Sequence, residues 1–217
     1  MEILSIKGVT KSFGKKEVLQ NINVSIKKGE IFGLIGRTGS GKSVLIKIII
    51  GFLKPDTGKI ILNNSIKNKI NFSMQHNSIY DYLTVKQNLK YFAKIYGLSK
   101  KERKIAIPEI IDRLSLKEFE NVIIKKLSGG TQKKVDIGCS LLNNPDILIF
   151  DEPFLGLDPE LVAKLGEFIW DLNKKGKTII ISSHDITQLK RICSKFAIIK
   201  NKNLIMVNKE NLLEAYK

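Results

Sequence analysis

The stretch Gly36-Arg37-Thr38-Gly39-Ser40-Gly41-Lys42-Ser43 fits the pattern G-x-x-x-x-G-K-[ST]. It follows an apolar run at residues 31–35 and precedes a helical pattern at residues 43–50, which is the context that this pattern requires. Its glycines allow a tight turn, so that successive backbone N–H groups and the start of the helix can bind phosphate oxygens. We expect the Lys42 ammonium to reach the β- and γ-phosphates of a nucleotide and the Ser43 hydroxyl to bind Mg²⁺.

Two adjacent carboxylates end a second apolar run, Ile147-Leu148-Ile149-Phe150-Asp151-Glu152. The short apolar or β-branched runs at 31–35, 147–150 and 178–182 are typical of parallel strands covered on both faces, and helical patterns follow each of them. Ligands bind at the carboxyl edge of such sheets. We therefore expect Asp151 to belong to the metal shell and Glu152 to act as the general base that polarises the attacking water.

The remaining chain completes an α/β pattern. The first thirty residues alternate apolar and polar side chains around a turn at 12–16, which predicts antiparallel strands, and residues 59–62 and 70–73 are expected to add more. Thr84 with Gln87 predicts a capping box before a helix that runs to residue 96, and Asp158 before Pro159 predicts a helix N-cap.

These patterns predict a phosphate-binding-loop fold of the α/β class. Its parts are a mostly parallel central sheet, an N-terminal antiparallel β subdomain and an inserted helical lobe. We expect a single domain over residues 1–217, in which 1–75 and 129–217 form the nucleotide-binding core and 76–128 form the lobe. The chain contains no internal repeat, so it holds one copy of each motif.

Further motifs resemble those of one family. Leu127-Ser128-Gly129-Gly130 precedes the acid pair, Gly156-Leu157-Asp158 follows it, and Ser183-His184-Asp185 follows the run at 178–182. Gln75 comes after the strand pattern at 70–74, and Phe13 lies in the sequence TKSFG. In this order, and over essentially the whole chain, these motifs resemble the signature, D-loop, switch histidine, Q-loop and adenine-stacking aromatic of ABC ATPases.

The resemblance implies an ATPase that uses ATP and Mg²⁺ and works as a head-to-tail dimer, in which the signature of one domain meets the phosphate loop of the other. It implies that His184 contacts the γ-phosphate and the water, and that Gln75 reports Mg²⁺ and water to the helical lobe. The catalytic candidates are Lys42, Gln75, Glu152 and His184. The metal candidates are Ser43, Gln75 and Asp151. The nucleotide-binding candidates are Phe13, Gly36, Arg37, Thr38, Gly39, Ser40, Gly41, Lys42, Ser43, Val44, Ser128, Gly129 and Gly130.

Several positions depart from the commonest family residues. Val44 stands where a second hydroxyl usually follows Ser43, which removes one hydrogen bond to the α-phosphate, a loss of about 1 kcal/mol. Thr131 replaces the usual fifth signature residue, and Phe154 and Leu155 replace small residues before the D-loop. Phe13 lacks the hydroxyl of the commoner tyrosine. None of these changes touches the expected metal ligand or base.

The segment at residues 82–98 resembles the helical lobe of ATPases that serve exporters of drugs, lipids or polysaccharides. That resemblance implies a transmembrane permease subunit on a separate chain, and a homodimer or a heterodimer with a paralogous ATPase. One alternative is a soluble ABC protein that acts as an ATP switch on ribosome or nucleic acid, although such proteins usually carry two ATPase modules. Another is a nucleotide-binding regulator without hydrolysis, which the intact Glu152 and His184 disfavour.

The composition is basic, with 37 Lys and Arg against 21 Asp and Glu and a formal net charge of +16. Because the cations are spread along the chain without interleaved aromatics, a solvated surface is favoured over attraction to an acidic membrane face, and nucleic-acid binding is the weakest alternative. The longest apolar stretch, at 44–52, is too short to cross a bilayer. The amino terminus lacks the features of a signal peptide, so we expect a cytoplasmic protein with Cys139 and Cys193 as reduced structural thiols. The family resemblance implies that it associates peripherally with the inner face of the cell membrane through the permease.

Overall fold

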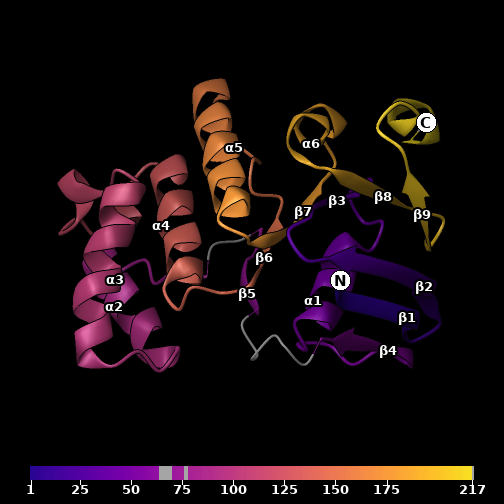
Figure 1. Ribbon diagram of the computed structural model, residues 1–217, viewed down its shortest axis with the longest axis horizontal. Coiled ribbons are helices and arrows are strands. Elements are labelled where there is room, and N and C mark those ends of the chain that lie inside the picture. The colour runs from indigo at the N-terminus through magenta and orange to yellow at the C-terminus, as the bar shows by residue number, and fades with distance from the viewer. Residues whose placement is uncertain (64–69, 76–77, 217) are drawn as a thin grey trace.

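The computed structural model describes residues 1–63, 70–75 and 78–216 (Figure 1). Its strands are β1 (Glu2–Phe13), β2 (Lys16–Lys27), β3 (Ile31–Ile35), β4 (Thr57–Leu62), β5 (Ile70–Ser73), β6 (Ile147–Asp151), β7 (Thr178–Ser183), β8 (Lys195–Lys200) and β9 (Asn203–Val207). Its α-helices are α1 (Lys42–Ile49), α2 (Val85–Ile95), α3 (Lys100–Arg113), α4 (Gly129–Leu141), α5 (Pro159–Lys174), α6 (Ile186–Ile192) and α7 (Leu212–Tyr216). Two 3₁₀ turns, Lys117–Phe119 and Ile124–Lys126, connect α3 to α4.

The strands form two sheets. A three-stranded antiparallel sheet has the order β2-β1-β4, and a six-stranded sheet has the order β5-β6-β7-β3-β8-β9. In the larger sheet, neighbouring strands are parallel except for β9, which is antiparallel to β8. The predicted α/β fold with an N-terminal antiparallel part and a mostly parallel central sheet is confirmed.

The expectation that residues 70–73 extend the antiparallel strands is wrong. β5 lies in the large sheet and pairs in parallel with β6, with Ile70 opposite Ile147. The polar residues Asn71 and Ser73 suggest a strand with one solvent-exposed face, yet both side chains are buried. Asn71 Nδ2 donates to the Ser140 carbonyl of α4 at 2.6 Å, so protein groups take the place of water.

Alternate residues of the parallel strands supply two separate hydrophobic cores. Phe32, Leu34, Ile147, Ile149 and Ile180 pack with the antiparallel sheet and α1 on one face. Their neighbours along the same strands pack with the remaining helices on the other face. Because side chains point to opposite faces of a strand in turn, a continuous apolar run is what a doubly covered sheet requires.

The two cysteines belong to the second of these cores. Cys139 and Cys193 are both free and buried. Burial raises the pKa of each thiol, which keeps both protonated at neutral pH. Both side chains therefore act as small apolar groups that fill the core.

The helical lobe is defined by local capping. The predicted capping box is present, because Thr84 Oγ1 accepts from the Gln87 N–H at 3.2 Å and Gln87 Oε1 accepts from the Thr84 N–H at 2.8 Å. The predicted N-cap Asp158 accepts from the Leu161 N–H at 2.9 Å, with Pro159 in the first turn of α5. Figure 1 shows α2, α3 and α4 side by side. The division of the chain at residues 76 and 128 stays a prediction, since α4 packs on β5 as well as on α2.

Gly58 of β4 lies very close to the backbone of the neighbouring strand β1. A Cβ at this position would lie 2.3 Å from the Gly8 backbone of β1, and its φ is +78°. Gly51, after α1, has the same φ of +78° and open space around it. We expect Gly51→Ala to lower the free energy of unfolding by about 1–2 kcal/mol. We expect Gly58→Ala to lower it by about 2–5 kcal/mol, since overpacking adds to the backbone strain. Equal urea midpoints for the two variants would contradict this account.

Candidate functional site

The phosphate-binding sequence forms the connection between β3 and α1. Gly39 and Gly41 have φ values of +81° and +107°, in the region where side chains other than glycine are strained. The Ser40 N–H donates to the Arg37 carbonyl at 3.0 Å, which closes the turn. A Cβ at Gly36 would lie 2.3 Å from Ser40 Oγ, so the loop folds back on itself at a position that only glycine fits. The loop places the first turn of α1 at the carboxyl edge of the sheet.

A cavity of about 550 Å³ surrounds this loop. Its walls bring together residues from distant parts of the sequence, namely Phe13, Lys16, Val18, Thr38 to Val44, Gln75, Glu152, Leu155 and His184. Most of the predicted site residues therefore line one cavity. Phe13 is 50% exposed at its rim, with the Lys11 ammonium 5.6 Å from the centroid of its ring. The volume lies within the range of cavities that hold small molecules such as nucleotides.

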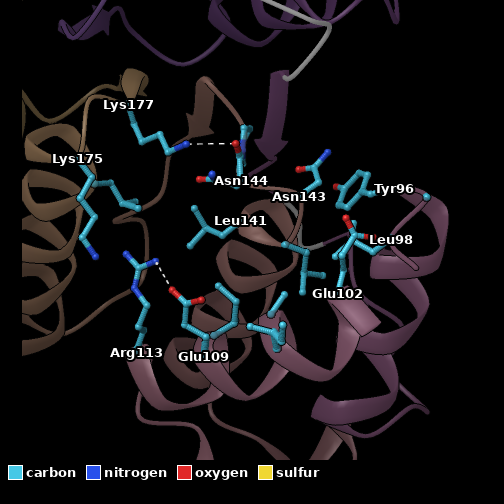
Figure 2. A pocket seen from close by; sticks show the side chains of 17 residues that line it. Tyr96, Leu98, Glu102, Glu109, Arg113, Leu141, Asn143, Asn144, Lys175 and Lys177 are labelled. Carbon is cyan, nitrogen blue, oxygen red and sulfur yellow. Dashed lines mark hydrogen bonds and ion pairs between the residues drawn. The ribbon is translucent and has the colours of Figure 1, made fainter. Parts of the chain in front are cut away.

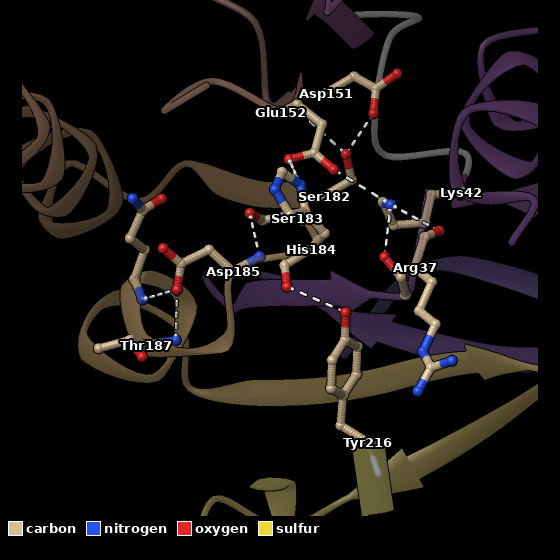
Figure 3. A network of polar contacts seen from close by, with 12 residues as sticks. Arg37, Lys42, Asp151, Glu152, Ser182, Ser183, His184, Asp185, Thr187 and Tyr216 are labelled. Atoms are coloured by element: carbon tan, nitrogen blue, oxygen red, sulfur yellow. Dashed lines mark hydrogen bonds and ion pairs between the residues drawn. The ribbon is translucent and has the colours of Figure 1, made fainter. Parts of the chain in front are cut away.

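The Glu152 carboxylate lies between two basic groups (Figure 3). Its Oε1 is 3.2 Å from the Lys42 ammonium, and its Oε2 is 3.0 Å from Nδ1 of His184. Lys42 and Glu152 are 6% and 7% exposed, so this ion pair is shielded from water. The Lys42 ammonium also donates to the Gly36 carbonyl at 2.7 Å. The carboxylate of Glu152, at the end of β6, therefore contacts both the phosphate loop and the residue that follows β7.

Backbone geometry directs this carboxylate. Glu152 has a φ of +50°, in the left-handed region, where a residue other than glycine is strained. Its N–H donates to the Ser182 carbonyl and hydroxyl, both at 3.1 Å, which holds the turn at the end of β6. The Ser182 hydroxyl in turn donates to Asp151 Oδ1. Ser182, which the sequence analysis does not single out, therefore orients both acidic residues.

Some predicted residues lie away from the cavity wall. Gly36 contributes its carbonyl to Lys42, and the guanidinium of Arg37 points away from Glu152 in Figure 3. Ser128 begins α4 as its N-cap, and its hydroxyl oxygen accepts from the Thr131 N–H at 3.2 Å. Within the described ranges, neither Ser128 nor the two glycines that follow it line the cavity around the phosphate loop.

Two residues of α4 hold the segment on both sides of Gln75. The Lys133 ammonium donates to the Met74 carbonyl at 2.7 Å. Asp136 accepts from the Ser73 hydroxyl, and from the Ser78 N–H at 3.0 Å. Burial raises the pKa of Asp136 and lowers that of Lys133, and the attraction between the two groups, 3.7 Å apart, opposes both shifts.

The sequence motifs do not point to this pair. The spacing of Lys133 and Asp136 on one helix could have indicated that their side chains share a face. It could not have indicated that their partners come from residues 73–78.

A second cavity, of about 910 Å³, lies between α3, the end of α4 and the end of α5 (Figure 2). Its charged groups are of both signs, and two contacts join polar groups of its wall. Arg113 is 3.7 Å from Glu109, and the Lys177 ammonium donates to the Asn144 carbonyl at 3.2 Å. These walls lack the clustered donors that a phosphate chain requires, so its volume alone does not make this cavity the nucleotide site.

The glycine-rich loop, the buried lysine and the acidic pair at the edge of a parallel sheet define a nucleotide-binding protein of the phosphate-binding-loop class. Residues 19–155 match the family model of the ABC transporter. The chain is 33% identical over 213 residues to the linearmycin resistance ATP-binding protein of Bacillus subtilis, covering 94% of this chain and 68% of that protein. It is 31% identical over 218 residues to the Nod factor export ATP-binding protein I of Sinorhizobium fredii, covering 97% and 64%.

Among solved structures, an ATP-binding cassette of an ABC transporter in its ADP conformation aligns with a TM-score of 0.84 and 28% identity, covering 99% of this chain and 94% of that one. The chain belongs to the ABC transporter ATP-binding family, as the resemblance of its motifs predicts, and is an ATPase subunit of that family. Over the ranges that the structure describes, no helix is long and apolar enough to span a membrane.

The link through Ser182 can be tested against its neighbour. Ser182→Ala removes the donor to Asp151 and one acceptor of the Glu152 N–H, and leaves a buried carboxylate oxygen without its partner. We expect the free energy of unfolding to fall by about 1–3 kcal/mol. Ser183→Ala, the control, removes only an acceptor of the Asp185 N–H, and should cost about 0.5–1.5 kcal/mol. A Ser182 variant that is as stable as the Ser183 variant in thermal unfolding would refute the linking role.

Proposed function

We propose that this subunit dimerises head to tail around two Mg-ATP and uses hydrolysis to drive a separate transmembrane permease subunit of the exporter type. The proposal rests on one observation: the two candidate phosphate-binding segments, the phosphate loop and the start of α4, are separate from each other. The phosphate loop lines one cavity, whereas Ser128 and Gly129 are exposed at the start of α4, outside the described wall of that cavity. Donors at the start of a helix attract an anion, and a second copy of the domain, or a paralogue, can supply that anion.

The phosphate loop and Phe13 would hold the nucleotide. Residues 38–43 line one cavity, and Phe13 offers an exposed ring at its rim for the adenine. Lys42 is buried beside the loop, held by Gly36 and Glu152. Phosphate oxygens in the loop would compete with Glu152 for this ammonium, which would free the carboxylate for another partner.

The residues beside the loop fit a magnesium ion. Asp151 Oδ2 and Ser40 Oγ are buried oxygen atoms with no hydrogen-bond partner among the described residues. Carboxylate and hydroxyl oxygens are the ligand types that Mg²⁺ takes, and Ser43 and Gln75 add oxygen donors on the cavity wall. A bound Mg²⁺ would neutralise charge on the phosphates. We infer that Asp151, Ser43 and Gln75 hold this ion.

Glu152 and His184 have the geometry of a base and its orienting partner. The His184 ring is 45% exposed at the cavity wall, and Nδ1 lies 3.0 Å from the carboxylate. Glu152 would accept a proton from a water beside the γ-phosphate, while His184 fixes the carboxylate and contacts the same phosphate. The left-handed backbone at Glu152 stores strain that an ordinary strand end would not need, which supports a functional role for its direction.

The functions of similar proteins support an exporter role. One of the similar proteins serves Nod factor export and another linearmycin resistance. We propose a permease of the drug, lipid or polysaccharide type on a separate chain, with peripheral association of this subunit at the inner face of the cell membrane. ATP binding at two shared sites would close the dimer, and loss of the γ-phosphate would open it again.

The dimer can be measured with the Glu152→Gln variant. This change keeps the shape of the side chain and removes the base, so we expect bound Mg-ATP to persist and the molar mass to double on adding Mg-ATP. Gel filtration with light scattering measures the mass. Lys42→Ala in the same background is the control and should stay monomeric, because its phosphate contact is lost. An ATP-bound Glu152→Gln protein that remains a monomer, alone and with its co-expressed permease, would overturn the head-to-tail proposal.

The missing hydroxyl at position 44 gives a second test. Val44 lines the cavity beside Ser43, where a hydroxyl could donate to the α-phosphate. One added hydrogen bond contributes about 0.5–1.5 kcal/mol, so we expect Val44→Thr to tighten ATP binding by about two- to twelve-fold. Isothermal titration measures the change. Val44→Thr replaces one methyl group by a hydroxyl, whereas Val44→Ala removes both methyl groups, adds no donor and should not tighten binding. Equal gains in both variants would contradict the assignment.

A further inference from the structure

A basic groove of about 590 Å³ runs between α2 and α3 on the helical lobe. Seven basic and two acidic side chains line it, so the wall carries five more positive than negative charges. The basic residues are Lys86, Lys90 and Lys94 of α2, Lys100, Arg103 and Lys104 of α3, and Lys117 of the turn that follows. The floor is apolar, and consists of the buried Ile107 and Ile111 with Pro108.

Only part of this charge is balanced within the protein. Glu120 pairs with Lys86 and with Lys117, and Arg103 donates to the Leu98 carbonyl at 2.7 Å. The side chains of the four remaining lysines form no hydrogen bond or ion pair with any residue in the described ranges: Lys90, Lys94, Lys100 and Lys104. These four ammonium groups are available to an external anion.

This arrangement of basic side chains destabilises both α2 and α3. Lys86, Lys90 and Lys94 follow one another at i, i+4 on the same face of α2, where like charges repel. The sequence Lys100-Lys101-Glu102-Arg103-Lys104 places four cations at the start of α3, the end of a helix that favours anions. An anion in the groove relieves both repulsions. The charge pattern is therefore better explained by a ligand than by helix formation.

We infer that this groove is a docking surface for the anionic headgroups of a phospholipid membrane. Charge complementarity requires an extended anion, because the cations are distributed over two helices. Exposed apolar side chains also occur on α2, outside the lining of the groove: Tyr91 and Ile95 are 40% and 59% exposed. Basic groups next to exposed aromatic and aliphatic side chains are typical of contacts with a membrane surface.

A single-stranded nucleic acid is the competing polyanion, and the groove suits it less well. Proteins that bind single strands stack bases on aromatic side chains within a basic groove. Among the described residues that line this groove, none is aromatic. The docking surface is also separate from the nucleotide cavity, so it does not depend on the roles proposed for that site.

Vesicle binding by the full-length chain tests the proposal. The probes are vesicles of phosphatidylcholine alone and of phosphatidylcholine with phosphatidylglycerol, at low and high salt. We expect binding to the anionic vesicles only, weakened by salt. Replacing Lys90, Lys94, Lys100 and Lys104 by Gln should reduce the partition coefficient by more than about ten-fold.

The matched control replaces Lys7, Lys28, Lys54 and Lys59 by Gln. These exposed lysines lie away from the groove, and their loss changes the net charge by the same amount. The control should keep most of the vesicle binding, and unchanged ATP binding in both variants would show that they are folded. Equal losses in the two variants would overturn the proposal. It would also be overturned by binding to an RNA oligonucleotide that the groove variant loses, with no binding to vesicles.

Discussion

The shared Glu152 carboxylate is the contact on which the site depends, because it joins two parts of the fold that are otherwise only neighbours. Lys42 is the first residue of α1, and His184 follows β7, yet both contact the same side chain. An ion pair this well buried is costly unless its geometry is fixed. The sheet fixes it: β3 and β6 both pair with β7, so the loop before α1 and the end of β6 emerge at one edge.

Hydrophobic cores cover both faces of this sheet, which explains why its carboxyl edge can be rigid. The parallel strands β3, β6, β7 and β8 send alternate residues into different cores, and both cores are filled with aliphatic and aromatic side chains. Polar groups are therefore concentrated where the strands end. The strain at Glu152 occurs at this edge, as does the Asp151 oxygen that has no hydrogen-bond partner among the described residues. A packed scaffold can stabilise groups that a loose one would release.

Local sequence predicts most of this arrangement, because the decisive signals act over a few residues. The glycine spacing of the loop, the apolar runs before it and the capping residues of α2 and α5 each depend on neighbours within one turn. The signals that fail depend on distant partners. β5 looks half-exposed because the groups that satisfy Asn71 and Ser73 come from α4, more than sixty residues away. The left-handed backbone of Glu152 has no local signature, since it is imposed by the contact with Ser182.

Helix α4 contains two residues, Lys133 and Asp136, to which no sequence motif points but which connect it to the segment around Gln75. Its first turn carries the signature, and its middle holds the Met74 carbonyl through Lys133 and residues 73 and 78 through Asp136. A helix moves as a rigid element, so a displacement of Ser128 displaces these anchors too. Both anchors are buried, which makes their rupture more costly than a shift of the entire segment. Hydrogen bonds from Lys133 and Asp136 thus connect the helix that Ser128 caps to residues on both sides of Gln75.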